Sequence, residues 1–243
     1  MIIETKKGWW LLFLVAAVFG LSGCDSDTLD IHVLIEEFLP QAVTTDQRTM
    51  ENDELPGEYD GGYTEIVLNE NKPTFTEADL DLSHGVWQIF SDLDHLNRVG
   101  VANALIGKES FPTDPREPLS IKPSGWNQKK LADGQWLYNR CHLVGHQMTG
   151  ENNNPKNLMT GTRSFNTPHM LNYENQVMDY IKLTGNHVRY RVTPHFVGNE
   201  LVARGIQMEA EGIEDQQFSY NVYIYNVQEG YTIDYSTGRA TKK

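Results

Sequence analysis

The stretch WLYNRCHLVGHQMTGENNNPKNLMTGTRSFNTPHMLNYE, residues 136–174, decides the fold of this chain. It begins inside GQWLYNRCHLVG, residues 134–145, which has the aromatic and β-branched content of a strand. Side chains alternate between the two faces of a strand. One face should therefore carry Trp136, Tyr138, Arg140 and His142.

A second strand and a helix are predicted in the rest of the stretch. Residues 157–166 read as a strand or extended arm after a turn-rich segment. Asn166 and Thr167 then suit a helix cap and Pro168 suits the first helical turn. The helix is expected to run to Leu183 and to end at Gly185. A strand, a strand and a helix, with a histidine on the first strand and an asparagine at the helix entrance, outline a ββα-metal finger.

The surrounding sequence predicts an α+β fold with a mainly antiparallel central sheet and flanking helices. Residues 63–68 read as a strand and residues 76–82 as a turn or capped segment, whereas residues 98–107 fit a core helix or a strand equally well. Downstream, three alternating segments rich in Val, Ile and Tyr read as strands: 187–196, 200–210 and 218–227.

The N-terminus has the pattern of an export signal. Lys6 and Lys7 precede an apolar run from Trp9 to Leu21, which is shorter than the ~20 residues of a membrane-spanning helix. Leu21-Ser22-Gly23-Cys24 resembles the lipobox of bacterial lipoproteins, which implies a signal peptide over 1–23 and a lipid on Cys24. An uncleaved signal anchor and an ordinary signal peptide are the alternatives. All three export the protein.

Charge is distributed unevenly along the 243 residues, whose formal net charge is −13. Residues 25–60 hold eleven acidic residues and one arginine, and residues 121–204 hold ten basic and five acidic residues. The first segment is too polar to order itself, so residues 24–60 are expected to form an acidic tether and residues 61–243 a folded domain. The positive excess therefore surrounds residues 136–174. The net negative charge of the whole chain thus argues less strongly against a phosphate-binding site in this stretch.

Asn139-Arg140-Cys141-His142 resembles the Asp-Arg-Gly-His motif of the DNA/RNA non-specific endonucleases. Asn166 and Glu174 match the family's metal-binding asparagine and the acidic residue eight positions later. The wider pattern over about residues 60–238 is similar to the DNA-entry nuclease and streptodornase branch.

The resemblance implies a catalytic site. His142 would be the general base, Asn166 would hold one Mg²⁺, with Mn²⁺ as the alternative ion, and Glu174 would orient water around it. Arg140 would contact the scissile phosphate, with Arg163 and Arg98 as weaker candidates for contacts to the substrate backbone. The substrate would be DNA, with RNA as a second one, cleaved to 5′-phosphate ends.

Two positions depart from the family motif. Asn139 replaces the usual aspartate, and Cys141 replaces a glycine or another small residue. A free thiol beside the base predicts oxidation-sensitive activity.

Each assignment has a simpler competitor. His142 could be a structural histidine, Asn166 only a helix N-cap and Glu174 a helix-surface acid. A zinc site of Cys141, His142 and His146 is disfavoured, because neighbouring strand residues point to opposite faces. The other alternative is a catalytically inactive surface lipoprotein of the same fold that binds nucleic acid or a protein partner; the existence of an inhibitor protein is left open.

Overall fold

The computed structural model describes residues 48–50 and 55–243. The predicted signal peptide, Cys24 and most of the predicted acidic tether lie outside these residues. Within the described residues, no helix is both long and apolar enough to cross a membrane.

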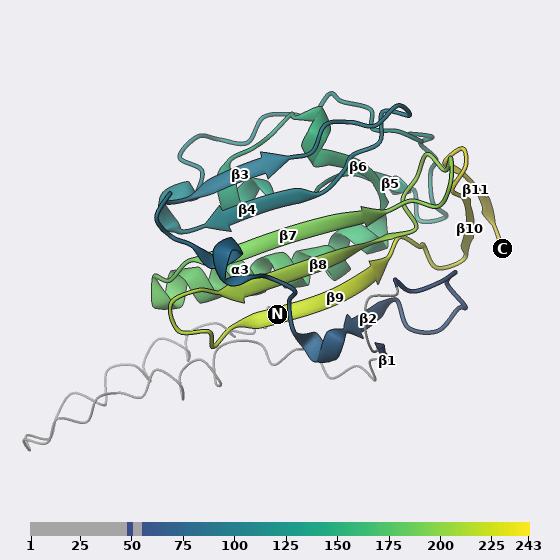
Figure 1. Cartoon of the computed structure of the whole chain (residues 1–243). Helices are drawn as coiled ribbons and strands as arrows, with labels where there is room; N and C mark the ends of the chain where they lie inside the picture. Colours follow the sequence, from purple (N-terminus) through teal and green to yellow (C-terminus); the bar gives the residue numbers. More distant parts are fainter. Residues whose placement is uncertain (1–47, 51–54) are drawn as a thin grey trace, which may run out of the picture.

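A twisted seven-stranded sheet organises the fold (Figure 1). Neighbouring strands are antiparallel except β1 and β2, which are parallel. In spatial order the strands are β1 (Arg48–Met50), β2 (Glu65–Leu68), β9 (Ser219–Tyr225), β8 (Gly205–Gly212), β7 (Val188–His195), β4 (Ala102–Ile106) and β3 (Trp87–Phe90). The predicted α+β class and antiparallel sheet are confirmed, and the ambiguous residues 98–107 contain the strand β4.

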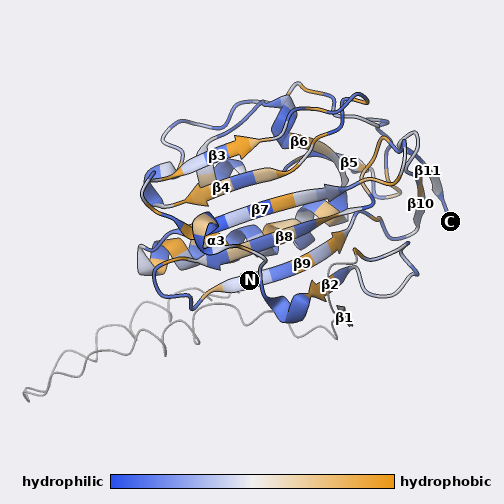
Figure 2. Ribbon diagram, in the orientation of Figure 1, coloured by the Kyte–Doolittle hydropathy of each residue, from blue (hydrophilic) through white to orange (hydrophobic). Residues whose placement is uncertain are grey.

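The main core lies where the sheet meets helix α3 (Leu171–Thr184). Hydrophobic and hydrophilic residues alternate along β7 and β8 (Figure 2). Helix α3 lies against one face of the sheet (Figure 1). Val177 and Ile181 of this helix are fully buried together with Val192 and Met208 of the sheet. Burying a side chain of this size contributes ~1.5–3 kcal/mol.

Short helical turns occupy several connections: η1 (Asn69–Asn71), η2 (Glu77–Leu80), η3 (Lys108–Ser110), α2 (His146–Thr149) and η4 (Pro155–Asn157). The predicted capped segment is η2, where Thr76 and Asp79 form a reciprocal capping box. A separate hairpin, β10 (Tyr231–Asp234) and β11 (Arg239–Lys242), ends the chain.

The predicted finger is present as β5 (Tyr138–His142), β6 (Leu158–Thr162), the turn η5 (Phe165–Met170) and helix α3. β5 and β6 pair as a two-stranded antiparallel sheet apart from the main one. The helix ends one residue beyond the predicted Leu183, and Gly185 follows it with φ 80°. In this left-handed conformation its N–H donates to the carbonyl of Ile181, which is why glycine suits the position.

Two buried asparagines connect the finger to the scaffold. Asn226 accepts from the N–H of Thr162 at 2.8 Å and donates to the carbonyls of Thr160 and Ala203, both at 3.0 Å. Asn157 bonds the backbone of Leu143 and Val144 just after β5. These amides satisfy backbone groups that the short finger strands leave unpaired, so they determine where β5 lies.

Part of the segment expected to be a tether packs on the sheet. Arg48–Met50 pairs with β2, and Leu55 and Tyr59 lie against the cluster of Ile66 and Tyr223. Ordered contacts to the sheet therefore begin before residue 61.

Candidate active site

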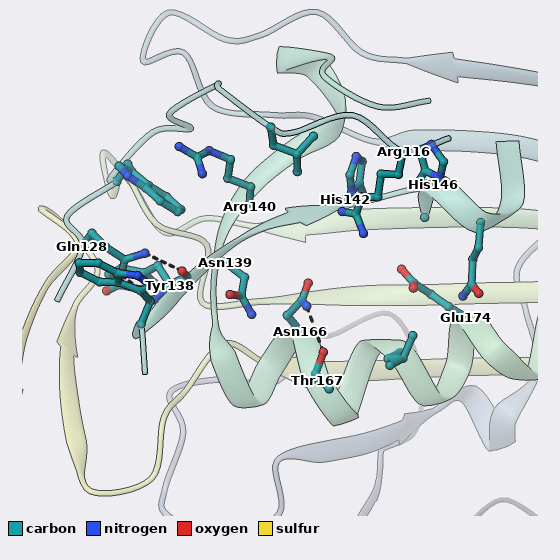
Figure 3. A pocket seen from close by; sticks show the side chains of 16 residues that line it. Arg116, Gln128, Tyr138, Asn139, Arg140, His142, His146, Asn166, Thr167 and Glu174 are labelled. Carbon is teal, nitrogen blue, oxygen red and sulfur yellow. Dashed lines mark hydrogen bonds between the residues drawn. The ribbon is translucent and has the colours of Figure 1, made fainter. Parts of the chain in front are cut away.

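A pocket of about 820 Å³ lies between the finger and the loop that precedes it (Figure 3). Polar groups and one aromatic end make up its wall, which consists of Arg116, Leu119, Trp126, Gln128, Trp136, Tyr138, Asn139, Arg140, His142, Gly145, His146, Gln147, Asn166, Thr167, Leu171 and Glu174. Four of the predicted site residues therefore share one pocket: Arg140, His142, Asn166 and Glu174.

His142 ends strand β5 and is only 7% exposed. Its Nε2 lies 2.7 Å from the carbonyl oxygen of Asn152. A carbonyl oxygen only accepts, so Nε2 must carry the hydrogen, and the lone pair of the neutral ring is then on Nδ1. This bond selects the tautomer that has a free basic nitrogen.

The pKa of His142 is lowered to about 4. Burial is the main cause, and the positive charges of Arg116 and His146 add to it, whereas the bond to Asn152 acts in the opposite direction. The ring is therefore neutral at pH 7, as a base must be. A phosphodiester arriving in the pocket would counter the same positive charges and raise the basicity of the ring.

Asn166 lies at the start of the helical segment but does not cap it. Its Nδ2 donates to Thr167 Oγ1 at 3.1 Å, and no side-chain bond caps η5 or α3. The carboxamide oxygen points into the pocket toward His142 (Figure 3). The N-cap alternative therefore does not describe this residue, and an oxygen donor is left facing the pocket.

Glu174 projects from the first turn of α3 into the pocket (Figure 3). Burial raises the pKa of Glu174 to about 8, and the charge of Arg116 and a hydrogen bond with Gln147 only partly oppose this. Its carboxylate also abuts Gly145, where an added Cβ would lie 3.1 Å from Cδ. Glu174 is thus a pocket residue rather than a helix-surface acid.

Arg140 is held in place before any substrate arrives. Its Nε donates to the carbonyl of Ile121, and its guanidinium lies 4.6 Å above the ring of Trp126. Within the described residues its two Nη groups make no hydrogen bond, so the fork that suits phosphate is free.

The other two predicted phosphate contacts lie outside the pocket. Arg98 is bonded to Asp94 and to the carbonyls of Gly198 and Glu200, so it fixes loops. Arg163 follows β6 without lining the pocket. Their placement does not support the sequence-based assignment.

Two pocket residues were missed by reading the sequence. Arg116, on an exposed loop rich in proline, is close enough to influence the pKa of His142, His146 and Glu174. His146, considered from the sequence as part of the disfavoured zinc site, lines the pocket as well. His146 lies shortly after the Asn139–His142 motif, so its position in the sequence was a usable signal. Nothing local in the sequence indicates that Arg116 reaches the site.

The two departures from the motif have different surroundings. Asn139 lines the pocket and faces Asn166 (Figure 3), so an amide stands where a carboxylate is usual. Cys141 is completely buried on the other face of β5, and an added Cβ on Gly161 would lie 2.2 Å from its sulfur. Burial also raises the pKa of the Cys141 thiol. The expected oxidation sensitivity is therefore wrong, because the sulfur is inaccessible and protonated.

The same geometry removes the zinc alternative, since Cys141 faces away from the pocket that His142 and His146 share. No group of three His, Cys, Asp or Glu side chains in the described residues is arranged to hold a metal ion.

Residues 80–213 match the family model of the DNA/RNA non-specific endonucleases, and the chain belongs to that family. It is therefore a hydrolytic nuclease that acts on nucleic acid. The fold is similar to the crystal structure of NucA from Streptococcus agalactiae with bound magnesium, at 26% identity over 73% of this chain and 87% of that one, with a TM-score of 0.66.

Two other solved structures agree with this assignment. The Sda1 nuclease with bound zinc is 25% identical over 65% of this chain and 80% of that one, with a TM-score of 0.57. An extracellular endonuclease is 25% identical over 68% of this chain and 91% of that one, with a TM-score of 0.55.

Proposed function

We propose that this protein is an exported, Mg²⁺-dependent, sequence-non-specific endonuclease that cleaves DNA and RNA to 5′-phosphate ends. The observation that carries the proposal is the hydrogen bond from His142 Nε2 to the carbonyl of Asn152, which leaves Nδ1 free in the pocket that also contains Asn166. A buried histidine with a purely structural role would use its second nitrogen as well.

The donors in the pocket suit a hard cation. Asn166 presents a carboxamide oxygen and Glu174 a carboxyl group whose ionised form a bound cation would favour, and the amide of Asn139 lies nearby. Mg²⁺ binds through few protein oxygens and keeps the rest of its sites for water and phosphate. When bound at Asn166, the cation would supply positive charge that stabilises the leaving 3′-oxygen. The magnesium of NucA is consistent with this choice.

The protein's own groups would carry out the remaining steps. Nδ1 of His142 takes the proton from the attacking water, a contribution of ~10²–10⁴-fold. The Nη groups of Arg140 and the guanidinium of Arg116 neutralise the charge that develops on the phosphate oxygens. Glu174 keeps water at its own end of the pocket. Loss of the bond to the 3′-oxygen leaves the phosphate on the 5′ side.

These contacts are all to phosphate, which explains why cleavage would not depend on sequence. The proposed arrangement is a nuclease domain that includes the sheet contacts of Arg48–Met50, Leu55 and Tyr59 as well as residues 61–243, with a shorter tether and lipid on Cys24, which would hold the enzyme on the outer face of the membrane. An extracellular endonuclease among the similar structures supports export.

Plasmid digestion with Mg²⁺, Mn²⁺ or EDTA tests the proposal. His142→Ala and Asn166→Ala should each abolish most cleavage, and Arg116→Ala should lower it. His84→Ala and Asn172→Ala are matched controls, because both residues are exposed and lie outside the pocket. Ligation of the products without a prior kinase step would identify 5′-phosphates. Undiminished cleavage by His142→Ala would exclude the mechanism. Inactivity of the wild type with every divalent ion would instead favour a binding protein.

A further inference from the structure

The end of the pocket farthest from Glu174 is aromatic. Figure 3 places Tyr138 and Gln128 at one end, Arg140 and His142 in between, and Glu174 at the other end. Trp126, Trp136 and Leu119 complete the lining that the phosphate chemistry does not use. An elongated pocket of this kind has room for more than one phosphate group.

Trp136 is the exposed aromatic side chain in this lining. One face of Trp126 is covered by Arg140, and Tyr138 is buried with its hydroxyl donating to the carbonyl of Gly238 at 2.8 Å. Trp136, in contrast, is 50% exposed. Four other large hydrophobic residues of the described chain are exposed, and none of them lines this pocket: Tyr63, Ile89, Leu183 and Val197.

Lys130 contacts Trp136 through both its backbone and its side chain. The backbones of the two residues pair in a short antiparallel bridge, and the ammonium of Lys130 lies 3.8 Å from the ring centroid. The neighbouring Gln128 has its amide engaged by the backbone of Tyr138 at 2.7 and 2.9 Å, so it has little capacity to read a base edge. The surroundings of Trp136 therefore offer a nucleobase a ring face and a positive charge. They do not offer it a means of distinguishing one base from another.

We infer that Trp136 is a stacking platform for an unpaired nucleobase of the strand being cleaved. Trp136 precedes Arg140 by four residues, which limits their Cα separation to at most ~14 Å, a distance that a few nucleotides span. Stacking on aromatic rings tolerates every base, because every base has a π-face. Bases inside a duplex already stack on one another, so the platform favours single-stranded DNA or RNA over duplex. The inference rests on the proposed nuclease function and specifies the form of its substrate.

The test compares a single-stranded oligonucleotide with a duplex of the same length, using the full-length protein with Mg²⁺. Trp136→Ala should raise KM for the single strand about ten-fold. It should leave kcat, and KM for the duplex, nearly unchanged. Trp136→Phe, which keeps a ring, should restore most of the loss. Ile89→Ala, an exposed residue outside the pocket, is the matched control. Equal KM changes for both substrates, or no change, would overturn the inference while leaving the nuclease function intact.

A binding measurement in EDTA separates this inference from failure of the proposed function. Oligothymidine should quench tryptophan fluorescence of the wild type and of His142→Ala, and the quenching should be smaller with Trp136→Phe. If the wild type binds and quenches in EDTA but does not cleave when Mg²⁺ is supplied, the proposed function fails and the platform stands. Identical quenching by Trp136→Phe would overturn the platform.

Discussion

Gly145→Ala should reduce catalysis without destabilising the fold. Gly145 has φ −61° and ψ 141°, which alanine adopts freely, so no backbone strain arises. An alanine Cβ would lie 3.1 Å from Cδ and Oε2 of Glu174 and 3.2 Å from Oε1. These separations are a few tenths of an ångström below normal van der Waals contact, and the carboxylate must move by about that much.

The size of the effect follows from the displacement. A misplacement of 1 Å costs ~10²-fold in rate, so a few tenths of an ångström should lower kcat about 3–10-fold, equivalent to ~0.7–1.4 kcal/mol. Stability should change little, because the ~0.4–1 kcal/mol gained by restricting the unfolded chain is offset by replacing glycine with alanine at the N-cap of α2.

The assay pairs kcat on a single-stranded oligonucleotide with the free energy of unfolding from urea titration. Gly57→Ala is the matched control, because no atom lies within 4 Å of its added Cβ and its φ is not in the left-handed region. The control should leave kcat unchanged. A fully active Gly145→Ala, or one whose activity loss is matched by a loss of stability, would refute the idea that Glu174 needs this close approach.

Three further predictions concern titration and anchoring. Because burial lowers the pKa of His142 to about 4 in the free enzyme, the acid limb of a kcat/KM–pH profile should fall near pH 4; a midpoint at 6.5 would contradict this. Burial alone would lower the pKa of His187, but hydrogen bonds with Glu214 and Glu109 outweigh it and raise the pKa. The stabilisation from His187 should thus be full below pH 6.5 and be lost as pH rises through the raised value, so His187→Gln should lower Tm at pH 5.5 more than at pH 9. Asn226→Ala removes three backbone hydrogen bonds and should cost about 3 kcal/mol in urea unfolding, with a loss below 1 kcal/mol counting against its anchoring role.

Local patterns in the sequence predicted the finger well. The alternation in residues 134–145 and the glycine at 185 each act on their own neighbours, so the strand and the helix end could be read directly. The predicted helix start was wrong, because Pro168 lies inside η5 and α3 begins at Leu171. The strand β4 could not be separated from a helix, because short apolar runs are compatible with both and only pairing with β3 and β7 decides between them.

Tertiary structure decided which charged side chains reach the pocket. Arg98 and Arg163 looked like phosphate contacts, but loop carbonyls hold the first, and the second lies outside the pocket. Arg116 is 24 positions before Arg140 in the chain and comes to the site only because its loop folds back over β5. An arginine's partners depend on long-range packing, which a local pattern does not encode.

Residue identities along the chain thus determined the family, the fold class and the chemical groups available: an imidazole, two amides, a carboxylate and a guanidinium. Burial and pairing then determined the state of those groups. The tautomer and low pKa of His142, the high pKa of Glu174 and the inert thiol of Cys141 all depend on which atoms surround them. Desolvation and hydrogen bonding from residues distant in sequence set those properties, so only the folded structure shows them.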